Sequence, residues 1–329
     1  MSIAKRLENV EVESLYSGAN SSIWRSHASA HELAKKAARE EDFVATLVTD
    51  GVPLLEERWR KVLGGKGIDV QVAGVFCHGH PQVEFDYPNG RVELADLLVV
   101  HRHSEGRSDA TRALLIQAKM SVDGTHKLDP KDPQLALYTT WPDFEFVTGG
   151  LKTGLRQINE KGKGSRYSLV LAREAYPEDI EWADQCPWSG TPAAVSLTAS
   201  RSLSKCLGDM LLGKDGRPVH FGSSTDQWSM MIKELLEVTA TRTYSRRNIG
   251  REDVPRGTAS AGTMHFSGQL RLLQIGEKKD RPRSLINRFF GSVPVIQNGD
   301  GGNQAPMEKQ VDFPEGGISS LIIQTMARG

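Results

Sequence analysis

The spacing of apolar and polar positions predicts three helices near the beginning of the chain. The Ala-, Lys- and Glu-rich stretch 29–39 favours helix, and a second helix is predicted over 41–48. A third is predicted over 53–63, because proline is favoured in a first helical turn and a Gly-Gly pair then ends the segment. Residues 1–28 show no period and are rich in Ser, Asn and Glu, which predicts a loosely held arm.

The period then changes to two, which is the pattern of half-buried β-strands. Four strands are predicted in succession, over 68–77, 82–87, 92–101 and 112–120. The sequence Tyr87-Pro88-Asn89-Gly90 predicts a tight turn after the second strand. A helix over 132–140 follows, with proline in its first turn. This order predicts an antiparallel meander covered by helices.

The pattern is weaker in the second half of the chain. Strands are predicted over 167–172 and 318–324, and helices over 202–212 and 226–242. The predicted fold class is α+β, a central mixed or antiparallel sheet flanked by helices with a C-terminal α/β extension. The chain divides into the arm 1–28, a core over 29–150, and residues 151–329, which complete the fold and bind substrate or a partner.

Composition and charge narrow the class of protein. The chain has 329 residues, with 41 basic and 41 acidic ones, and enough apolar residues for a large core. It has no apolar run long enough for a bilayer span and no secretory signal, so we expect a cytoplasmic protein without a membrane partner. The three cysteines show no CxxC spacing, which argues against a disulfide framework or a zinc ribbon.

The charges are unevenly distributed along the chain. Acidic residues outnumber basic ones in 1–150, and the reverse holds in 151–329. Basic clusters at 242–256 and 278–288 could contact phosphates, although an ordinary solvated surface explains them equally well.

Five polar residues carry the candidate chemistry. Asp96 stands at the edge of the apolar run 97–100, where a carboxylate is costly unless it is paired or binds a metal. Gln117 and Lys119 share one face of the next strand because they are two positions apart. Gln134 and Tyr138 share one face of the following helix, four positions apart.

These residue types suit the hydrolysis of a phosphodiester. Asp96, the side-chain carbonyl of Gln117 and a backbone carbonyl could provide the oxygen ligands that a divalent cation needs. The cation would acidify a water molecule and balance charge on the phosphate. The ammonium group of Lys119 could orient that water or hold the scissile phosphate.

The segment 50–140 resembles the PD-(D/E)XK nuclease superfamily. Asp96 matches the acid that begins one core strand, and Gln117 and Lys119 match the D/E/Q-x-K triplet of the next strand. Gln134 and Tyr138 resemble the QxxxY motif of the RecB-type branch, which would position the substrate. The resemblance implies a restriction-endonuclease-like core that binds Mg²⁺ or Mn²⁺.

Two features of the resemblance leave alternatives open. Gln117 replaces the commoner acid, so the site has one negative charge fewer and we expect weaker metal binding. The family often adds a Glu from a preceding helix. Glu56 is our candidate for this third metal ligand, with Glu57 and Glu41 as alternatives; Glu93 has a lower claim, because its odd spacing from Asp96 would place it on the other face of a regular strand.

Other interpretations of the same residues compete with this one. Asp96 and Lys119 could form a buried salt bridge, and Glu84 and Asp86 are rival acids for the cation. A zinc cluster would need residues from two segments, namely Cys77, His78, His80, His101 and His103.

The predicted function is therefore a metal-dependent nuclease, acting on DNA rather than RNA, in phage defence or DNA processing. The alternative is a nucleic-acid-binding or complex-forming subunit on the same fold, with its metal site weakened by Gln117. A protein partner is expected to bind through the C-terminal half, and a homo-oligomer is a further expectation.

Overall fold

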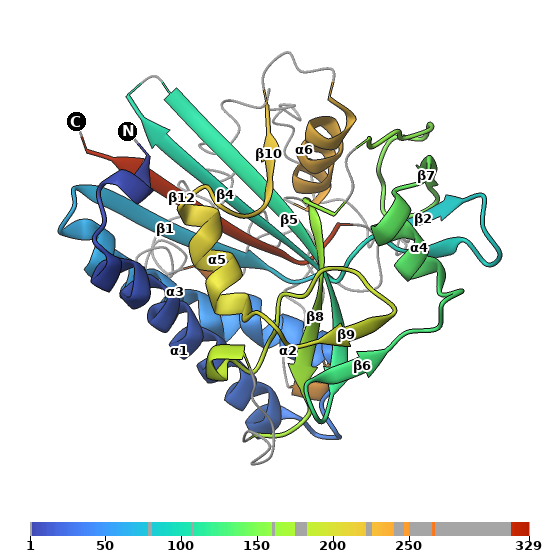
Figure 1. Cartoon of the computed structure of the whole chain (residues 1–329), viewed down its shortest axis with the longest axis horizontal. Helices are drawn as coiled ribbons and strands as arrows, with labels where there is room; N and C mark the ends of the chain where they lie inside the picture. Colours follow the sequence, from blue (N-terminus) through green and yellow to red (C-terminus); the bar gives the residue numbers. More distant parts are fainter. Residues whose placement is uncertain are drawn as a thin grey trace, which may run out of the picture.

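A computed structural model describes residues 2–77, 81–106, 108–159, 162–174, 183–221, 226–239, 247–249, 265–266 and 317–328. Seven strands of this part form a central mixed sheet (Figure 1). They are β1 (Ile68–Val75), β4 (Leu97–Glu105), β5 (Ser108–Ser121), β8 (Ser165–Leu171), β10 (Arg217–Val219), β11 (His265–Phe266) and β12 (Ser320–Ala327). Their order is β10-β5-β4-β12-β1-β11, and β8 pairs with the C-terminal half of β5.

The last strand of the chain lies inside this sheet, between β1 and β4. Ile322 of β12 is opposite Ala73 on one side and Val100 on the other. Strand β12 runs parallel to β4, and β8 runs parallel to β5, so the predicted antiparallel meander is wrong. Periodicity identifies a strand but not its neighbours, because pairing depends on residues far apart in sequence.

Two smaller sheets extend from the central one. The first comprises β2 (Gln82–Phe85), β3 (Arg91–Glu93) and β7 (Phe144–Phe146), and the second comprises β6 (Thr125–Lys127) and β9 (Ser196–Thr198). The single strand predicted over 92–101 is therefore two strands. Residues 94–96 form a bend between β3 and β4.

Helix α1 (Asn9–Leu33) occupies most of the segment that was predicted to be a loose arm, and that prediction is wrong. Its buried face is made largely of small residues, among them Gly18, Ala19 and Ser22. A Cβ at Gly18 would lie 2.9 Å from the Cβ of Arg58, so α1 packs very close to α3 (Val52–Gly64). Small residues produce little hydrophobic periodicity, so the sequence pattern does not predict this helix.

The remaining helices surround the sheet. They are α2 (Glu40–Thr46), α4 (Pro133–Thr140), α5 (Leu203–Leu211) and α6 (Gln227–Thr239), with a π-helical segment at Leu47–Gly51 and short 3-10 turns at Ile3–Lys5, Ala183–Gln185 and Arg247–Ile249. The helices predicted over 53–63, 132–140 and 202–212 are confirmed. The helix predicted over 29–39 is confirmed only for 29–33 and is wrong beyond it, because α1 ends at Leu33 and the chain turns extended at Ala34.

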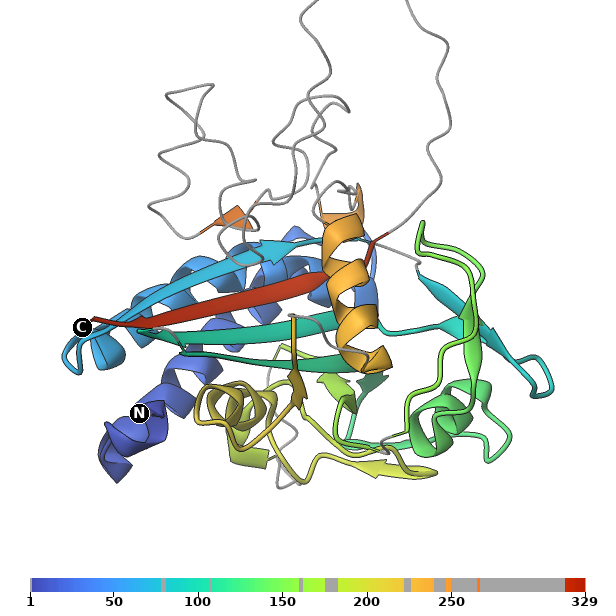
Figure 2. The same cartoon turned by 90° about the horizontal axis from the view of Figure 1, so that it is seen from above.

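The sheet separates two apolar cores. Helices α1, α3 and α5 cover one face, which we call the α1 face, and α4, α6 and the sheet of β2, β3 and β7 cover the other, the α6 face. In Figure 2 the orange α6 crosses in front of the sheet and blue helices lie behind it. The fold is thus α+β with a mixed sheet flanked by helices, as predicted. No helix in the described part of the chain combines the length and the apolar run needed to cross a bilayer.

Candidate functional site

The beginning of β4 meets the C-terminal half of β5, and this meeting point brings Asp96 and Gln117 into contact. The side-chain amide of Gln117 donates a hydrogen bond to Oδ2 of Asp96. The backbone N–H of Ala118 donates to the same oxygen at 2.6 Å. The N–H of Asp96 donates to the carbonyl of Ile116 at 3.0 Å, which fixes the bend against β5. Lys119 follows on the α6 face of β5, on the same side as Gln117.

The Asp96 carboxyl is in an environment that disfavours its charge. Burial raises its pKa to about 8, and the neighbouring carboxylates of Glu93 and Glu40 act in the same direction. The Ala118 N–H and the charge of Lys119 lower the pKa, but they do not compensate. A stable salt bridge to Lys119 would instead lower the pKa below its usual value, so the direction argues against the salt-bridge interpretation.

The carboxylate of Glu93 raises the pKa of Asp96. The odd spacing of the two residues would place them on opposite faces of a regular strand. The bend at 94–96 interrupts the strand between these two residues. The alternation of side chains is therefore lost, and the two carboxylates come close enough to interact.

Three buried polar atoms on β5, α4 and β8 have no hydrogen-bond partner among the residues that the structure describes. They are Oε1 of Gln117, Nε2 of Gln134 and the hydroxyl of Tyr167. Tyr167 on β8 is opposite Gln117 in the parallel pairing, and the Asp96 charge affects its pKa. Leaving a buried polar group unpaired costs about 1–3 kcal/mol, so the two such groups beside Asp96, on Gln117 and Tyr167, suggest that a bound molecule or ion satisfies them.

The sequence predicts that Tyr138 positions the substrate, but in the structure its hydroxyl bonds to the backbone. Its side chain is only 1% exposed, and its hydroxyl donates to the carbonyl of Leu94 at 2.8 Å. A group so deeply buried holds the bend before Asp96 in place and does not reach a substrate. Burial raises its pKa well above the usual value, so the hydroxyl stays protonated as a donor.

The candidate metal ligand Glu56 lies on the other face of the sheet, so this prediction is wrong. Its Oε2 accepts a hydrogen bond from the N–H of Val72 at 2.9 Å, and its Oε1 pairs with Arg60. It belongs to the α1 face, above β1, and β12 separates β1 from β4. The alternative Glu57 is an exposed residue paired with Lys61 at 2.6 Å.

Glu40 is the upstream carboxylate that the structure places beside Asp96, and sequence reasoning missed it. It is the first residue of α2, and its Oε1 accepts a hydrogen bond from the N–H of Met120 at 3.3 Å. The predicted helix began one residue later, at Glu41. Tyr167 was missed as well, because only the pairing of β8 with β5 shows that it lies opposite Gln117.

The rival sites lie elsewhere. Glu84 and Asp86 are exposed residues on and just after β2, in a different sheet. Among the described residues, no group of three or more His, Cys, Asp or Glu could hold a metal ion. His78 and His80 of the proposed zinc cluster lie outside the described residues, as do the basic cluster 278–288 and all of 242–256 except 247–249.

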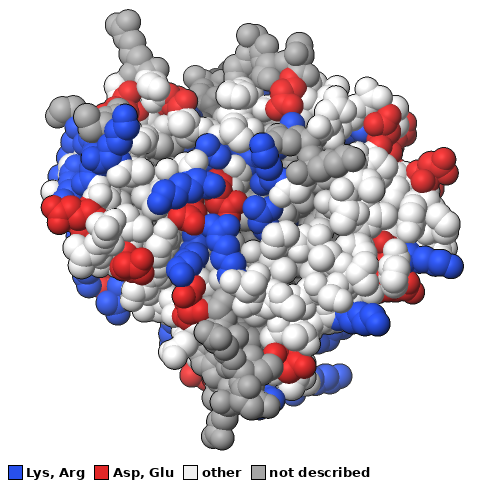
Figure 3. Space-filling view, in the orientation of Figure 1, with Lys and Arg blue, Asp and Glu red and all other residues white. Residues whose placement is uncertain are grey.

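Basic side chains gather on one face of the molecule, over α5 and β10, with acidic side chains among them (Figure 3). Several of these cations are engaged in ion pairs. The pairs include Arg201 with Asp209 at 2.5 Å and with Asp215 at 2.8 Å, Arg166 with Asp215 at 3.1 Å, Lys205 with Asp184 at 2.9 Å and Arg217 with Asp226 at 3.2 Å. Their charge is therefore largely compensated within the protein.

The oxygen atoms near Asp96 fit a hard divalent cation. Mg²⁺ is commonly held by one or two carboxylates, with water and substrate phosphates completing its shell. The Asp96 carboxylate and the unpartnered Oε1 of Gln117 meet that requirement. Rotating the Gln117 amide by 180° would turn Oε1 toward Asp96, and the two orientations are nearly indistinguishable by shape.

Comparison with known proteins adds no constraint to this geometry. The chain matches no protein-family model, no curated protein and no solved structure.

Proposed function

We propose that this protein is a Mg²⁺- or Mn²⁺-dependent nuclease that hydrolyses phosphodiester bonds, in DNA rather than RNA. The contact between Asp96 and Gln117, with Gln117 Oε1 buried and unpartnered beside it, is the observation that carries the proposal. The resemblance of Asp96, Gln117 and Lys119 to the PD-(D/E)XK motif supports the reaction class.

Asp96 and Gln117 would hold the cation, and Glu40 is the closest candidate for a further ligand from a helix. The bound cation would neutralise phosphate charge and make an attacking water more acidic. Asp96 must be ionised to bind it, so metal binding is expected to release a proton near neutral pH.

The other residues have supporting tasks. Lys119 places a positive charge on the same side as Asp96, where it can hold the scissile phosphate or orient the water. Tyr138 keeps the bend at 94–96 fixed through Leu94. Gln134 would position the substrate through its Nε2, a buried donor that has no hydrogen-bond partner among the described residues.

Cleavage assays on plasmid, linear duplex, single-stranded DNA and RNA test this proposal. The wild type is expected to cut DNA with Mg²⁺ or Mn²⁺. Asp96→Asn is expected to lose more than about 100-fold, since even outer-shell partners of a metal contribute roughly 10–100-fold. Glu56→Gln is the matched control and should keep the activity of its folded fraction. Equal cleavage by wild type and Asp96→Asn would contradict the site assignment.

A second function deserves a test because Gln117 stands where an acid is commoner. With one negative charge fewer, the same fold could bind nucleic acid without cutting it. Such a subunit would bind DNA equally well in chelator and would show no cleavage with either metal. A nuclease would bind Mn²⁺ in a manner that depends on Asp96.

The biological setting follows only from the family resemblance. We propose a role in phage defence or DNA processing in the cytoplasm, with a protein partner bound by the C-terminal half or with self-association. Measuring the oligomeric state in solution, with and without DNA, tests the last of these expectations.

A further inference from the structure

The 3-10 turn Arg247–Ile249 lies against the beginning of α2, although 206 positions separate Asn248 from Asp42 in the sequence. Ile249 is 1% exposed and packs into the core of the α1 face. The turn is therefore an anchored part of the fold, and it brings the second half of the chain next to the segment that carries Glu40.

Asn248 holds the connection between α1 and α2 through both its backbone and its side chain. Its backbone carbonyl accepts a hydrogen bond from the N–H of Lys35 at 2.7 Å, and its Oδ1 accepts from the N–H of Lys36 at 3.0 Å. Its Nδ2 donates to Oδ2 of Asp42 at 2.7 Å and to the carbonyl of Lys36 at 3.4 Å. The oxygen and the nitrogen of this amide thus have opposite partners, so a carboxylate cannot make the same contacts.

Asp42 links Asn248 to the first turn of α2. Asp42 is 0% exposed, and the oxygen that accepts from Asn248 also accepts from the N–H of Arg39 at 2.9 Å. Arg39 precedes the helix, and Glu40 is the first residue of the helix. A hydrogen bond from the third helical residue back to the residue before the helix stabilises the first turn. Asn248 therefore supports the turn from which the Glu40 side chain extends.

The Glu40 side chain reaches an open edge of β5. Strand β4 pairs with β5 only as far as Ile116, and β5 continues beyond it. On this edge the N–H of Ala118 donates to Oδ2 of Asp96 at 2.6 Å. Two positions further along, the N–H of Met120 donates to Oε1 of Glu40 at 3.3 Å. Two carboxylates thus accept from N–H groups about 7 Å apart on one strand edge.

We infer that Asn248 is a positioning residue of the proposed metal site, because it keeps the Glu40 carboxylate on the edge of β5 beside Asp96. The hydrogen bonds that described residues donate to these carboxylates use Oδ2 of Asp96 and Oε1 of Glu40. Oδ1 and Oε2 can therefore face a divalent cation. The role of Glu40 as a ligand rests on the proposed function, whereas its placement requires no metal.

Amide exchange of Met120 in the metal-free, full-length protein measures the placement of Glu40, because the Met120 N–H donates to it. Asn248→Ala removes the bond to Asp42, and Asn248→Asp places two carboxylates against each other. Both should speed the exchange about tenfold, as expected for loss of one hydrogen bond to a charged group. Combining Asn248→Asp with Asp42→Asn restores an amide–carboxylate pair and should return the exchange toward the wild-type rate. Unchanged exchange in both single variants would overturn the inference.

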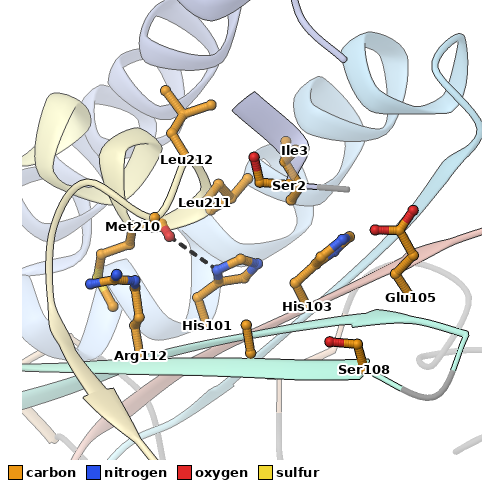
Figure 4. Close-up of a pocket in the computed structure, with 12 residues that line it drawn as sticks. Ser2, Ile3, His101, His103, Glu105, Ser108, Arg112, Met210, Leu211 and Leu212 are labelled. Atoms are coloured by element: carbon orange, nitrogen blue, oxygen red, sulfur yellow. Dashed lines mark hydrogen bonds between the residues drawn. The ribbon is translucent and has the colours of Figure 1, made fainter. Parts of the chain in front are cut away.

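A variant toward the other end of β4 controls for a general loss of stability. His101 lines a cavity of about 240 Å³ there and is hydrogen-bonded to the carbonyl of Met210 at 3.1 Å (Figure 4). His101→Phe removes this bond at a place away from α2, so it should leave the exchange of Met120 unchanged relative to the other amides of β5. If His101→Phe speeds the exchange of Met120 as much as Asn248→Ala does, the effect of Asn248 is a general one and the inference is wrong.

Mn²⁺ titrations test whether this placement matters for the metal site. Asn248→Ala and Glu40→Gln should each weaken Mn²⁺ binding by roughly 10–100-fold, the usual loss when a group that orients a metal ligand is changed. In the double variant the two effects should not add, because Asn248 acts through Glu40. Additive losses would contradict the inference. A wild type that binds no Mn²⁺ would overturn the proposed function, and the exchange of Met120 would still decide whether Asn248 places Glu40.

Discussion

Asp96 and Glu56 are two carboxylates on opposite faces of one sheet, and the structure gives them opposite surroundings. Both oxygens of Glu56 have positive or donor partners, the N–H of Val72 and the guanidinium of Arg60. Asp96 receives two donors on a single oxygen and has other carboxylates nearby, so its pKa is raised to about 8.

This difference separates a carboxylate whose charge is stabilised by its surroundings from one whose charge is disfavoured. A buried carboxylate beside a cation is favoured in its charged form, and replacing it leaves its hydrogen-bond donor unsatisfied. A carboxylate beside other carboxylates is disfavoured in its charged form, and perturbed groups of this kind cluster at functional sites. The predictions below test the contrast, beginning with the largest effect.

Glu56→Ala should lower the free energy of unfolding by about 3 kcal/mol, because it leaves the buried Val72 N–H without its charged acceptor, whereas the partly exposed Arg60 can turn to solvent. Glu57→Ala is a matched control, since Glu57 is the next residue of the same helix and forms an exposed ion pair with Lys61. This control should leave the free energy of unfolding almost unchanged, because solvent screens an exposed ion pair. Urea unfolding measures both, and equal effects would contradict the structural role of Glu56.

Asp96→Asn should stabilise the metal-free protein, and the gain should grow from about pH 4 to about pH 8. In this window the unfolded state has lost the Asp96 proton while the folded state still binds it, so wild-type stability falls as pH rises. The gain should reach about 2–3 kcal/mol, a value discounted for the solvent that reaches this partly exposed side chain. Unfolding free energies across this range provide the measurement, and a gain independent of pH would break the contrast with Glu56.

Titration of His27 should make the free energy of unfolding change with pH in the opposite direction. Burial lowers its pKa to about 4, so between that value and about 6.5 the unfolded state binds the proton and the folded state does not. Stability is therefore lost as pH falls, by about 2 kcal/mol at pH 5. His27→Phe should flatten this part of the profile, because phenylalanine does not titrate. An unchanged profile would show that His27 remains solvated.

Binding of Mg²⁺ should change the free energy of unfolding by the smallest amount among these predictions. At ten times its dissociation constant it should stabilise the wild type by about 1.4 kcal/mol. Asp96→Asn should remove this stabilisation, whereas Glu57→Ala should retain it. Thermal unfolding with Mg²⁺ and with chelator measures the shift. An equal shift in wild type and Asp96→Asn would mean that the cation binds elsewhere.

Local sequence determined several elements of this protein. Alternation and turn residues predicted β1, β2, β5 and β8, and a proline in the first turn predicted α3 and α4. The same alternation placed Gln117 and Lys119 on one side of β5 without any knowledge of the fold. These features depend on residues that are close in sequence, where the backbone geometry fixes which side chains share a face.

Tertiary structure alone decided the rest. The insertion of β12 between β1 and β4, the place of Glu40 beside Asp96 and the position of Glu56 on the far face depend on contacts between distant segments. Helix α1 is stable because its small residues allow close packing against α3, and no local pattern reports that contact. The donor that Glu56 meets on β1 and the carboxylate of Glu40 beside Asp96 are likewise properties of the folded chain, because each comes from a different strand or helix, whereas Arg60 lies on the same helix as Glu56.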